Sequence, residues 1–154
     1  MPASKNHTES LFKLGLIYYD LKNDYYKAVQ YLTPAANQNH CESQYLLGNI
    51  YENGLGLQKD INKSIYFYSL AANQNHEKAQ FKLGEIYEKG INVNVDIKKA
   101  IFYYSLAANQ NDSESQFKLG HIYEEGIYVP FDINKAIQYY TLAANNRHRV
   151  AMFN

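Results

Sequence analysis

Two Ser-x-x-Lys segments are the residues in this sequence best suited, by type and spacing, to catalysis. Ser10 precedes Lys13 and Ser115 precedes Lys118, so each pair places a hydroxyl and an amine one helical turn apart. A lysine at this spacing serves as the base for a serine nucleophile in penicillin-interacting hydrolases. Ala79 replaces the serine in another copy of the segment, and the chain has neither Ser-Asp-Asn nor Lys-Thr-Gly to complete such a site. We therefore predict that the chain is not an enzyme and keep hydrolysis only as a remote alternative.

Histidines that recur at one position of the sequence are the metal-binding candidates. His40, His76 and His148 are spaced by multiples of 36 residues, and Asp112 fills the remaining place. A metal site needs ligands that converge within a few ångströms, whereas equivalent residues on packed neighbouring helices lie about 10 Å apart. We therefore predict turn or helix-start roles for these residues, and neither a metal nor another cofactor. His121 differs, because it occurs in one copy only.

Both patterns arise from a 36-residue unit that is written three times, with a shorter copy in front of it. The unit is marked by recurring residues: Gly48, Gly84 and Gly120, then Gly54, Gly90 and Gly126, then Asp60, Asp96 and Asp132. A period of this length is typical of stacked supersecondary units rather than of one globular core. Residues shared by all copies are therefore packing residues first, and residues that differ between copies can carry specificity.

Each unit is predicted to contain two helices. In the third copy, apolar residues at helical spacing predict a first helix over 79–88 that ends at Gly90, and a second over 97–108 that Asp96 caps. Gly84 lies inside the first helix, where glycine is unfavourable, so we expect another helix to pass close to it. Asn111 is expected to close the unit in a left-handed conformation.

The order of these residues resembles the Sel1-like repeats, relatives of the tetratricopeptide repeats. The third copy carries the pattern as Leu83-Gly84, Tyr87, Gly90, Asp96, Lys99-Ala100, Tyr103-Tyr104 and Ala107-Ala108. The resemblance implies an all-α, right-handed α-solenoid of helix-turn-helix repeats, with four repeats plus a partial fifth. We expect a polar N-terminal tail over 1–8, a repeat domain over 9–148 and the start of a truncated fifth repeat over 149–154. The repeats themselves are expected at 9–40, 41–76, 77–112 and 113–148.

Two departures from the pattern lie near the ends. The first copy lacks the loop glycine, is three residues shorter between its helices and has Pro34 inside its second helix, where a kink is expected. Arg147 stands where the earlier copies have asparagine. We expect a turn there, followed by a new first helix from Arg149.

Composition restricts the kind of partner. Fifteen basic and fifteen acidic side chains cancel, which argues against nucleic acid or an anionic membrane as the main partner. Cys41 is the single cysteine, so no disulfide framework is available. The sequence has neither a signal-peptide pattern nor an apolar run long enough for a transmembrane helix, and we predict a cytoplasmic protein.

Helical geometry and the family resemblance together predict a protein-binding concave face made by the first helix of each repeat. Four positions should face it, at −3, +1, +4 and +5 from the repeat glycine, which is Gly15, Gly48, Gly84 or Gly120. The candidate residues are Phe12, Leu16, Tyr19, Tyr45, Asn49, Glu52, Phe81, Glu85, Glu88, Lys89, Phe117, His121, Glu124 and Glu125. The −3 position is always aromatic, the +1 position differs in every copy and the +4 position is acidic in three. This pattern suits a peptide with apolar and basic side chains.

Two non-enzymatic functions remain open. The first is a scaffold or adaptor that binds a partner protein on the concave face. The second is a structural module that stacks through an open C-terminal end, with weak self-association.

Overall fold

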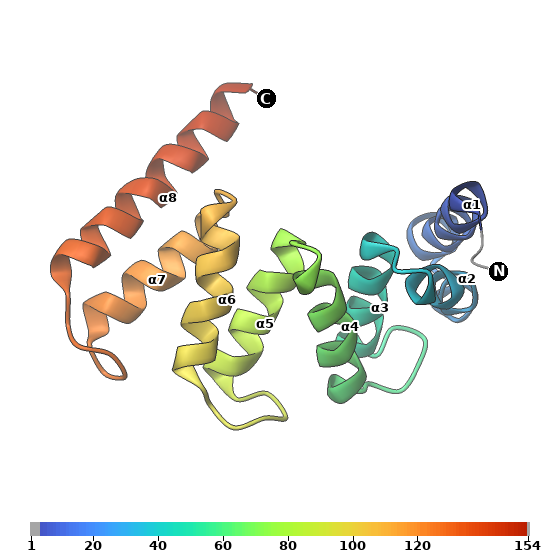
Figure 1. Cartoon of the computed structure of the whole chain (residues 1–154), viewed down its shortest axis with the longest axis horizontal. Coiled ribbons are helices and arrows are strands. Elements are labelled where there is room, and N and C mark those ends of the chain that lie inside the picture. Colours follow the sequence, from blue (N-terminus) through green and yellow to red (C-terminus); the bar gives the residue numbers. More distant parts are fainter. Residues whose placement is uncertain (1–3, 154) are drawn as a thin grey trace. The chain divides into compact units, whose positions relative to one another are not determined.

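The structure, a computed structural model, describes residues 4–153, and describes side chains up to residue 147. This part of the chain is helical and contains no strand. Its elements are α1 (Lys5–Leu16), η1 (Ile17–Leu21, a π-helical turn), α2 (Tyr25–Asn37), α3 (Cys41–Asn53), α4 (Ile61–Asn73), α5 (Glu77–Lys89), α6 (Ile97–Asn109), α7 (Ser113–Glu125) and α8 (Ile133–Phe153) (Figure 1). The predicted all-α repeat architecture is confirmed. The chain divides into two compact units, Met1–Ala79 and Gln80–Asn154.

The first unit consists of two helical hairpins, in which α1 packs on α2 and α3 packs on α4. Helix α2 also packs on α3, so the two hairpins share one core. The buried residues of this core are Ala28, Leu32, Ala36, Leu46, Leu47 and Ile50. Asp24 and Asp60 cap α2 and α4 by accepting hydrogen bonds from the backbone N–H groups of Lys27 and Lys63.

The second unit repeats this arrangement with α5 to α8. Its core contains Ile97, Ala100, Tyr104, Ala108, Leu119 and Ile122. Four of these residues belong to α6 and two to α7, so α7 covers the apolar face of α6. Asp96 caps α6 by accepting a hydrogen bond from the backbone N–H of Lys99 at 3.0 Å, which confirms its predicted role.

The repeat glycines lie where the two helices of a hairpin approach most closely. A Cβ atom added to Gly84 would lie 2.5 Å from Cε1 of Tyr104, and one added to Gly48 would lie 2.5 Å from Cδ1 of Tyr68. Both tyrosine side chains are fully buried. The predicted close approach at Gly84 is therefore confirmed, and the neighbour is the second helix of the same repeat.

A second set of aromatic contacts stabilises the other end of each hairpin. The tyrosine three residues after the repeat glycine stacks on an aromatic ring of the second helix, as Tyr87 does on Tyr103 at 5.8 Å between ring centroids. The Nζ atom of Lys99 lies over the Tyr87 ring, 4.9 Å from its centroid. Tyr123, Tyr139 and Lys135 repeat the arrangement, so the lysine of the repeat pattern has a packing role.

Left-handed residues join the helices where the sequence predicts them. Asn39, Asn75 and Asn111 have φ values of 64°, 66° and 72° at the ends of repeats. Arg147 breaks this series, and α8 runs without interruption from Ile133 to Phe153. The structure thus differs from the expected turn and new first helix after Arg149, because arginine favours the helix and resists the left-handed conformation. The side chains of residues 148–154, including His148, lie outside the described residues.

The first repeat closes its shorter connection with the π-helical turn η1. The N–H of Lys22 bonds to the carbonyl of Ile17 at 3.2 Å, and Asn23 then adopts a φ of 49°. The π-helical turn thus ends the first helix of this repeat, where the other repeats end it at a loop glycine. Helix α2 continues past Pro34 to Asn37.

Helix α1 begins earlier than expected and takes up part of the predicted tail over 1–8. It starts at Lys5, because the Ser4 hydroxyl accepts a hydrogen bond from the N–H of His7. In the described part of the chain, no helix is both long and apolar enough to cross a membrane.

Replacing Gly84 with valine should destabilise the second unit. The new side chain would meet the buried Tyr104 ring, and overpacking of this kind costs about 1–3 kcal/mol or more. Urea unfolding measures the loss, with Gln138→Val as a control because Gln138 is exposed on α8. Equal stability of the two variants would show that helix α5 does not pack on α6 at Gly84.

Candidate functional site

The acidic residues at the +4 position are hydrogen-bonded within their own repeats. Each accepts a hydrogen bond from the tyrosine that packs against the repeat glycine: Tyr68 to Glu52 at 2.7 Å, Tyr104 to Glu88 at 2.7 Å and Tyr140 to Glu124 at 2.5 Å. These carboxylates therefore have a structural partner before any ligand arrives. Sequence reasoning placed them on the candidate face but missed this contact.

The tyrosines of these bonds have raised pKa values, and the pKa of Glu88 is lowered. Burial, followed by the bond to Glu88, raises the pKa of Tyr104 far above its usual value. Burial and the bond to Glu124 raise the pKa of Tyr140 to about 12. Burial alone would raise the pKa of the Glu88 carboxyl, but hydrogen bonds from Lys118 and Tyr104 hold it below its usual range. Glu88 is therefore a carboxylate at neutral pH.

The first repeat replaces this pair with a different one. Leu32 takes the tyrosine's place against Gly15, and Tyr19 occupies the +4 position. The Tyr19 hydroxyl accepts a hydrogen bond from the Asn49 side chain at 2.6 Å. The structure thus brings together two predicted site residues, Tyr19 and Asn49, from successive repeats of the first unit.

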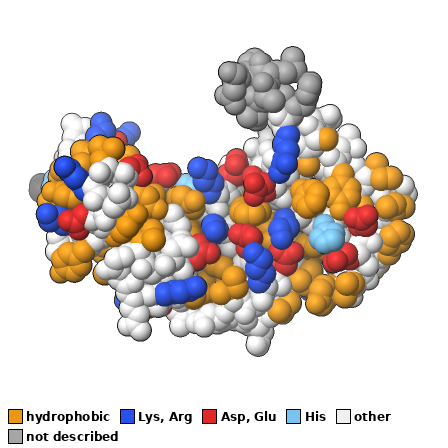
Figure 2. Space-filling model, turned by 180° about the vertical axis from the view of Figure 1, so that it is seen from behind, with side chains coloured by type: hydrophobic (Ala, Val, Ile, Leu, Met, Phe, Trp, Pro, Cys, Tyr) orange, Lys and Arg blue, Asp and Glu red, His pale blue; other side chains and the backbone are white. Residues whose placement is uncertain are grey.

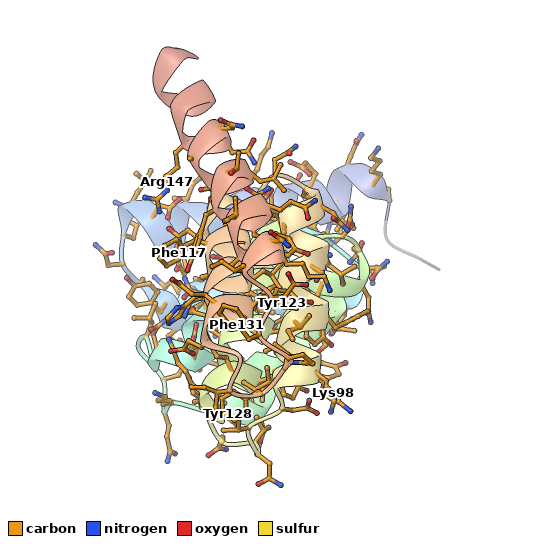
Figure 3. The ribbon with its side chains drawn as sticks, turned by 90° about the vertical axis from the view of Figure 1, so that its left-hand side faces the viewer. Lys98, Phe117, Tyr123, Tyr128, Phe131 and Arg147 are labelled. Carbon is orange, nitrogen blue, oxygen red and sulfur yellow. The ribbon has the colours of Figure 1, made fainter. Side chains whose placement is uncertain are left out.

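The aromatic residues at −3 mainly contribute packing. In the first unit, Phe12 lies 4.4 Å from the His40 ring, and Tyr45 stacks on His76 at 4.5 Å between centroids. In the second unit, Phe81 packs on Tyr104 at 5.7 Å and is half-buried. Phe117 packs on Tyr140 at 5.4 Å between centroids, but it differs from the others because 53% of it is exposed; Figure 3 labels its position.

His40 and His76 begin helices, as predicted, whereas His148 falls within the continuous helix α8 and does not begin one. His76 Nδ1 accepts a hydrogen bond from the N–H of Ala79 at 3.2 Å, and its Nε2–H can then donate to Glu42, 3.0 Å away. This bond lowers the pKa of the Glu42 carboxyl. His40 Nδ1 accepts likewise from the N–H of Ser43. At the start of α7, the Asp112 side chain accepts a hydrogen bond from the N–H of Ser115. The described residues contain no cluster of three or more histidine, cysteine, aspartate or glutamate side chains that could hold a metal.

Charged residues of the candidate face differ between α5 and α7. On α5, Glu85 pairs with Lys89 at 2.9 Å and lies 3.8 Å from Lys82. Glu88 pairs with Lys118 of α7 at 2.9 Å. These contacts neutralise the predicted acidic edge in the third repeat.

Helix α7 keeps an exposed and acidic face. His121 Nε2 lies 3.3 Å from Glu125 and its Nδ1 lies 4.0 Å from Glu124. All three side chains are between 43% and 51% exposed. Figure 2 shows charged side chains of both signs interspersed with hydrophobic ones on the visible face, without a large field of one sign.

Leu16 and Lys89 complete the predicted set. Leu16 is half-buried against the core of the first unit, whereas Lys89 is exposed. The predicted residues thus fall into half-buried ones, from the first three repeats, and exposed ones, chiefly on α7.

Buried glutamines that join successive repeats were missed by sequence reasoning. The Gln44 side chain is 1% exposed, donates to the Ala36 carbonyl at 3.2 Å and accepts from Gln74 at 2.7 Å. In the second unit, Gln116 donates to the Ala108 carbonyl at 3.1 Å and accepts from Asn146 at 2.8 Å. The available signal was a glutamine four residues before the repeat glycine in three copies, inside an otherwise apolar stripe.

Comparisons with known proteins agree with this geometry. The Sel1 repeat family model matches residues 8–40, 41–76, 77–112 and 113–148. A Sel1 repeat protein from Oxalobacter formigenes is 33% identical, with a TM-score of 0.82 over 95% of this chain and 61% of its own. The protective antigen c5321, present in uropathogenic Escherichia coli strains, is 30% identical, with a TM-score of 0.83 over 90% of this chain and 30% of its own.

A third structure shares the fold alone. Immunity protein Pa5087 from Pseudomonas aeruginosa is 22% identical, with a TM-score of 0.63 over 90% of this chain and 54% of its own. The chain therefore spans less than two thirds of the length of each of these three proteins. No curated protein matches it.

Removing the Tyr104 hydroxyl should lower stability in a pH-dependent way. Because folding raises the pKa of Tyr104, the stabilisation is full below about pH 10, the pKa of an exposed tyrosine, and is lost as the pH rises toward the folded-state pKa. We expect Tyr104→Phe to lose about 1 kcal/mol at neutral pH, and the difference from wild type to shrink above about pH 10.

Urea unfolding at neutral and alkaline pH measures this difference. Tyr66→Phe is the matched control, because Tyr66 is 60% exposed on α4. A stability difference for Tyr104→Phe that stays constant into alkaline pH would contradict the raised pKa of Tyr104 that burial and the bond to Glu88 produce.

Proposed function

The chain belongs to the Sel1 repeat family, and from this premise we propose that it is a non-enzymatic scaffold or adaptor that binds a partner protein. Sel1 repeat proteins generally mediate protein–protein interactions, and the family is a non-catalytic scaffold family. The Ser115-x-x-Lys118 segment does not favour a hydrolase, since Ser115 is fully buried and Lys118 pairs with Glu88. In the other segment, the Ser10 hydroxyl donates to the Asn6 carbonyl at 2.8 Å.

One observation carries the assignment of the binding surface. On α7, four side chains are substantially exposed: Phe117, His121, Glu124 and Glu125. The same helix packs on α6 and α8 and buries Leu119 and Ile122 in the core. His121 and Glu125 are 47% and 43% exposed, and their residue types differ from those of the other copies. Residues that a fold does not need and that vary between repeats are suited to recognition.

The other candidate residues would support this surface within each unit. In the second unit, α5 carries the candidate residues Phe81, Glu85, Glu88 and Lys89. Glu85 pairs with Lys89, and Glu88 pairs with Lys118, so these charged side chains are held in place. In the first unit, the Tyr19–Asn49 hydrogen bond orders the equivalent face, which also contains Phe12, Leu16, Tyr45 and Glu52. Side chains that are already ordered lose little entropy on binding.

The exposed residues of α7 determine the chemistry of the proposed partner. Phe117 offers an apolar contact, and the two carboxylates beside His121 favour positive charge. We therefore propose a peptide segment in which apolar and basic side chains alternate, bound in an extended or helical form.

Reversing the charge of α7 should weaken binding of such a segment. The probe is a fluorescently labelled peptide of alternating leucine and arginine residues, titrated by anisotropy. Because Glu125 is at a solvent-exposed rim, we expect Glu125→Lys to weaken binding by about 3- to 10-fold, and added salt to reduce the wild-type affinity. The Tyr140 hydroxyl donates its hydrogen bond to Glu124 and not to Glu125, so we expect the change to spare the fold.

The control for this experiment is Gln138→Lys, which introduces the same side chain on the exposed side of α8 and changes the net charge by one unit, against two units in Glu125→Lys. The Phe117→Ala variant tests the apolar contact separately. Equal loss of binding in Gln138→Lys and Glu125→Lys would indicate attraction to overall charge only, and would remove the α7 site.

The alternative function, stacking between copies, is favoured by the apolar face of α8. Ile133, Ile137 and Leu142 are 44%, 57% and 41% exposed. The equivalent face of α6 is covered by α7, and Ile97, the counterpart of Ile133, is only 9% exposed. Exposed apolar surface of this kind is a site for association.

Stacking predicts a change in mass with concentration. Sedimentation of the chain should show association that weakens in Ile137→Asp and persists in Gln138→Asp, since Gln138 is the adjacent exposed polar residue. A chain that stays monomeric at every concentration would exclude stacking through α8 and leave the scaffold function unaffected.

A further inference from the structure

The loops between the two helices of each repeat differ more than the helices do. Counting from the glycine that ends the first helix, the second loop position is Gly56, Asn92 and then Tyr128 in successive full repeats. The fifth position is Lys59, Val95 and then Phe131. The helices keep one packing pattern throughout, so this variation has no origin in the core.

In the second unit, these varying positions expose large apolar side chains. Val95 is 52% exposed, Tyr128 66% and Phe131 63%; Tyr128 and Phe131 are labelled in Figure 3. Their neighbour Val129 does the packing, because it is half-buried against the core of the unit. The loop of the fourth repeat thus packs Val129 against the core and leaves the side chains of Tyr128 and Phe131 exposed.

This exposure belongs to the loop position itself. Val95 lies in the third repeat and is followed by the whole fourth repeat in the same unit, yet half of its surface is still accessible. A following repeat therefore does not cover the fifth loop position. Ile127 carries no part of this argument, since its counterpart Ile91 is half-buried.

Two of these exposed loop residues, Val95 and Tyr128, form one wall of a pocket. The pocket is open, has a volume of about 440 Å³ and is lined by Val95, Asp96, Ile97, Lys98 and Tyr128. It therefore lies between the loop of the third repeat, the start of α6 and the loop of the fourth. We call it the loop pocket.

The charge available in the loop pocket is positive. Asp96 is already used, because it caps α6 through the N–H of Lys99 and lies 4.0 Å from the Lys99 ammonium group. Lys98 makes no ion pair within the part of the chain that the structure describes, and its side chain is exposed. An incoming carboxylate would therefore find one unpaired ammonium group beside the apolar wall.

A pocket in the first unit, within the loop of the second repeat, is more polar. It is lined by Tyr51, Leu57, Gln58, Lys59, Asp60 and Lys63. Lys63 lies over the Tyr51 ring and near Asp60. The apolar wall of the loop pocket is not a requirement of the repeat fold, since Lys59 stands in the second repeat where Val95 stands in the third, and Gly56 and Asn92 stand where Tyr128 does.

We propose that the loop pocket is a second protein-interaction surface, which binds a peptide segment with an aromatic or aliphatic side chain next to a glutamate or aspartate. The apolar side chain packs on Val95 and Tyr128, and the carboxylate pairs with Lys98. This preference is opposite in charge to that proposed for α7. The two surfaces can therefore select different partners, and neither proposal depends on the other.

The test uses two matched peptides, acetyl-Gly-Glu-Phe-Leu-Glu-Gly-amide and the same peptide with both glutamates changed to lysine. Each is titrated into the isotope-labelled chain while amide chemical shifts are followed by NMR. We expect the glutamate peptide to shift residues 91–98 and 127–131, and to bind about 3- to 10-fold more tightly than the lysine peptide. The Lys98→Glu variant should reverse this preference.

A second set of variants tests the apolar wall. Tyr128→Ser should weaken the glutamate peptide by about 10-fold, whereas Phe102→Ser should leave it unchanged, because Phe102 is 57% exposed on α6 outside the pocket. Circular dichroism checks that both variants keep their helices. Equal binding of the two peptides by wild type, an unchanged preference in Lys98→Glu or shifts confined to other residues would overturn the proposal.

Discussion

The hairpins depend on one contact, in which a side chain of the second helix packs against the repeat glycine of the first helix. Because Gly84 has no side chain, the Tyr104 ring lies directly against the backbone of α5. The ring's depth in turn places its hydroxyl within 2.7 Å of Glu88. Glu88 then pairs with Lys118 on the next first helix. A single missing methyl group thus sets the spacing within a repeat and helps to fix the spacing between two repeats.

Much of this architecture follows from the sequence, because its determinants are local. A glycine at a helix end, an aspartate before a helix and an asparagine between repeats each specify a backbone conformation by themselves, and Gly90, Asp96 and Asn111 adopt the predicted roles. The continuous α8 follows the same logic, since Arg147 lacks the left-handed preference of asparagine. The repeat period alone predicts a turn at this point, whereas the residue type of Arg147 favours a continuous helix.

The candidate surface was predicted less completely, because periodicity reveals which face a residue occupies and not which atom it contacts. Glu88 lies on the first helix as expected, but its bonds to Tyr104 and Lys118 come from residues 16 and 30 positions away. Gln116 was overlooked because a polar residue in an apolar stripe suggests solvent, whereas here the previous repeat supplies its acceptor. The loop pocket escaped notice for a related reason, as loops carry no periodic signal.

The buried glutamines have a consequence for how such a gene can change. Gln44 in the first unit and Gln116 in the second each donate to the end of the preceding second helix and accept from a glutamine or asparagine near the end of their own repeat. The repeat junction within each unit therefore presents the same donor and acceptor. An in-frame duplication or loss of one whole repeat at such a junction joins two ends that already fit, so recombination between copies can alter the length of the array in single steps. Point mutations are then free to diversify the loops and the exposed helix positions of each new copy.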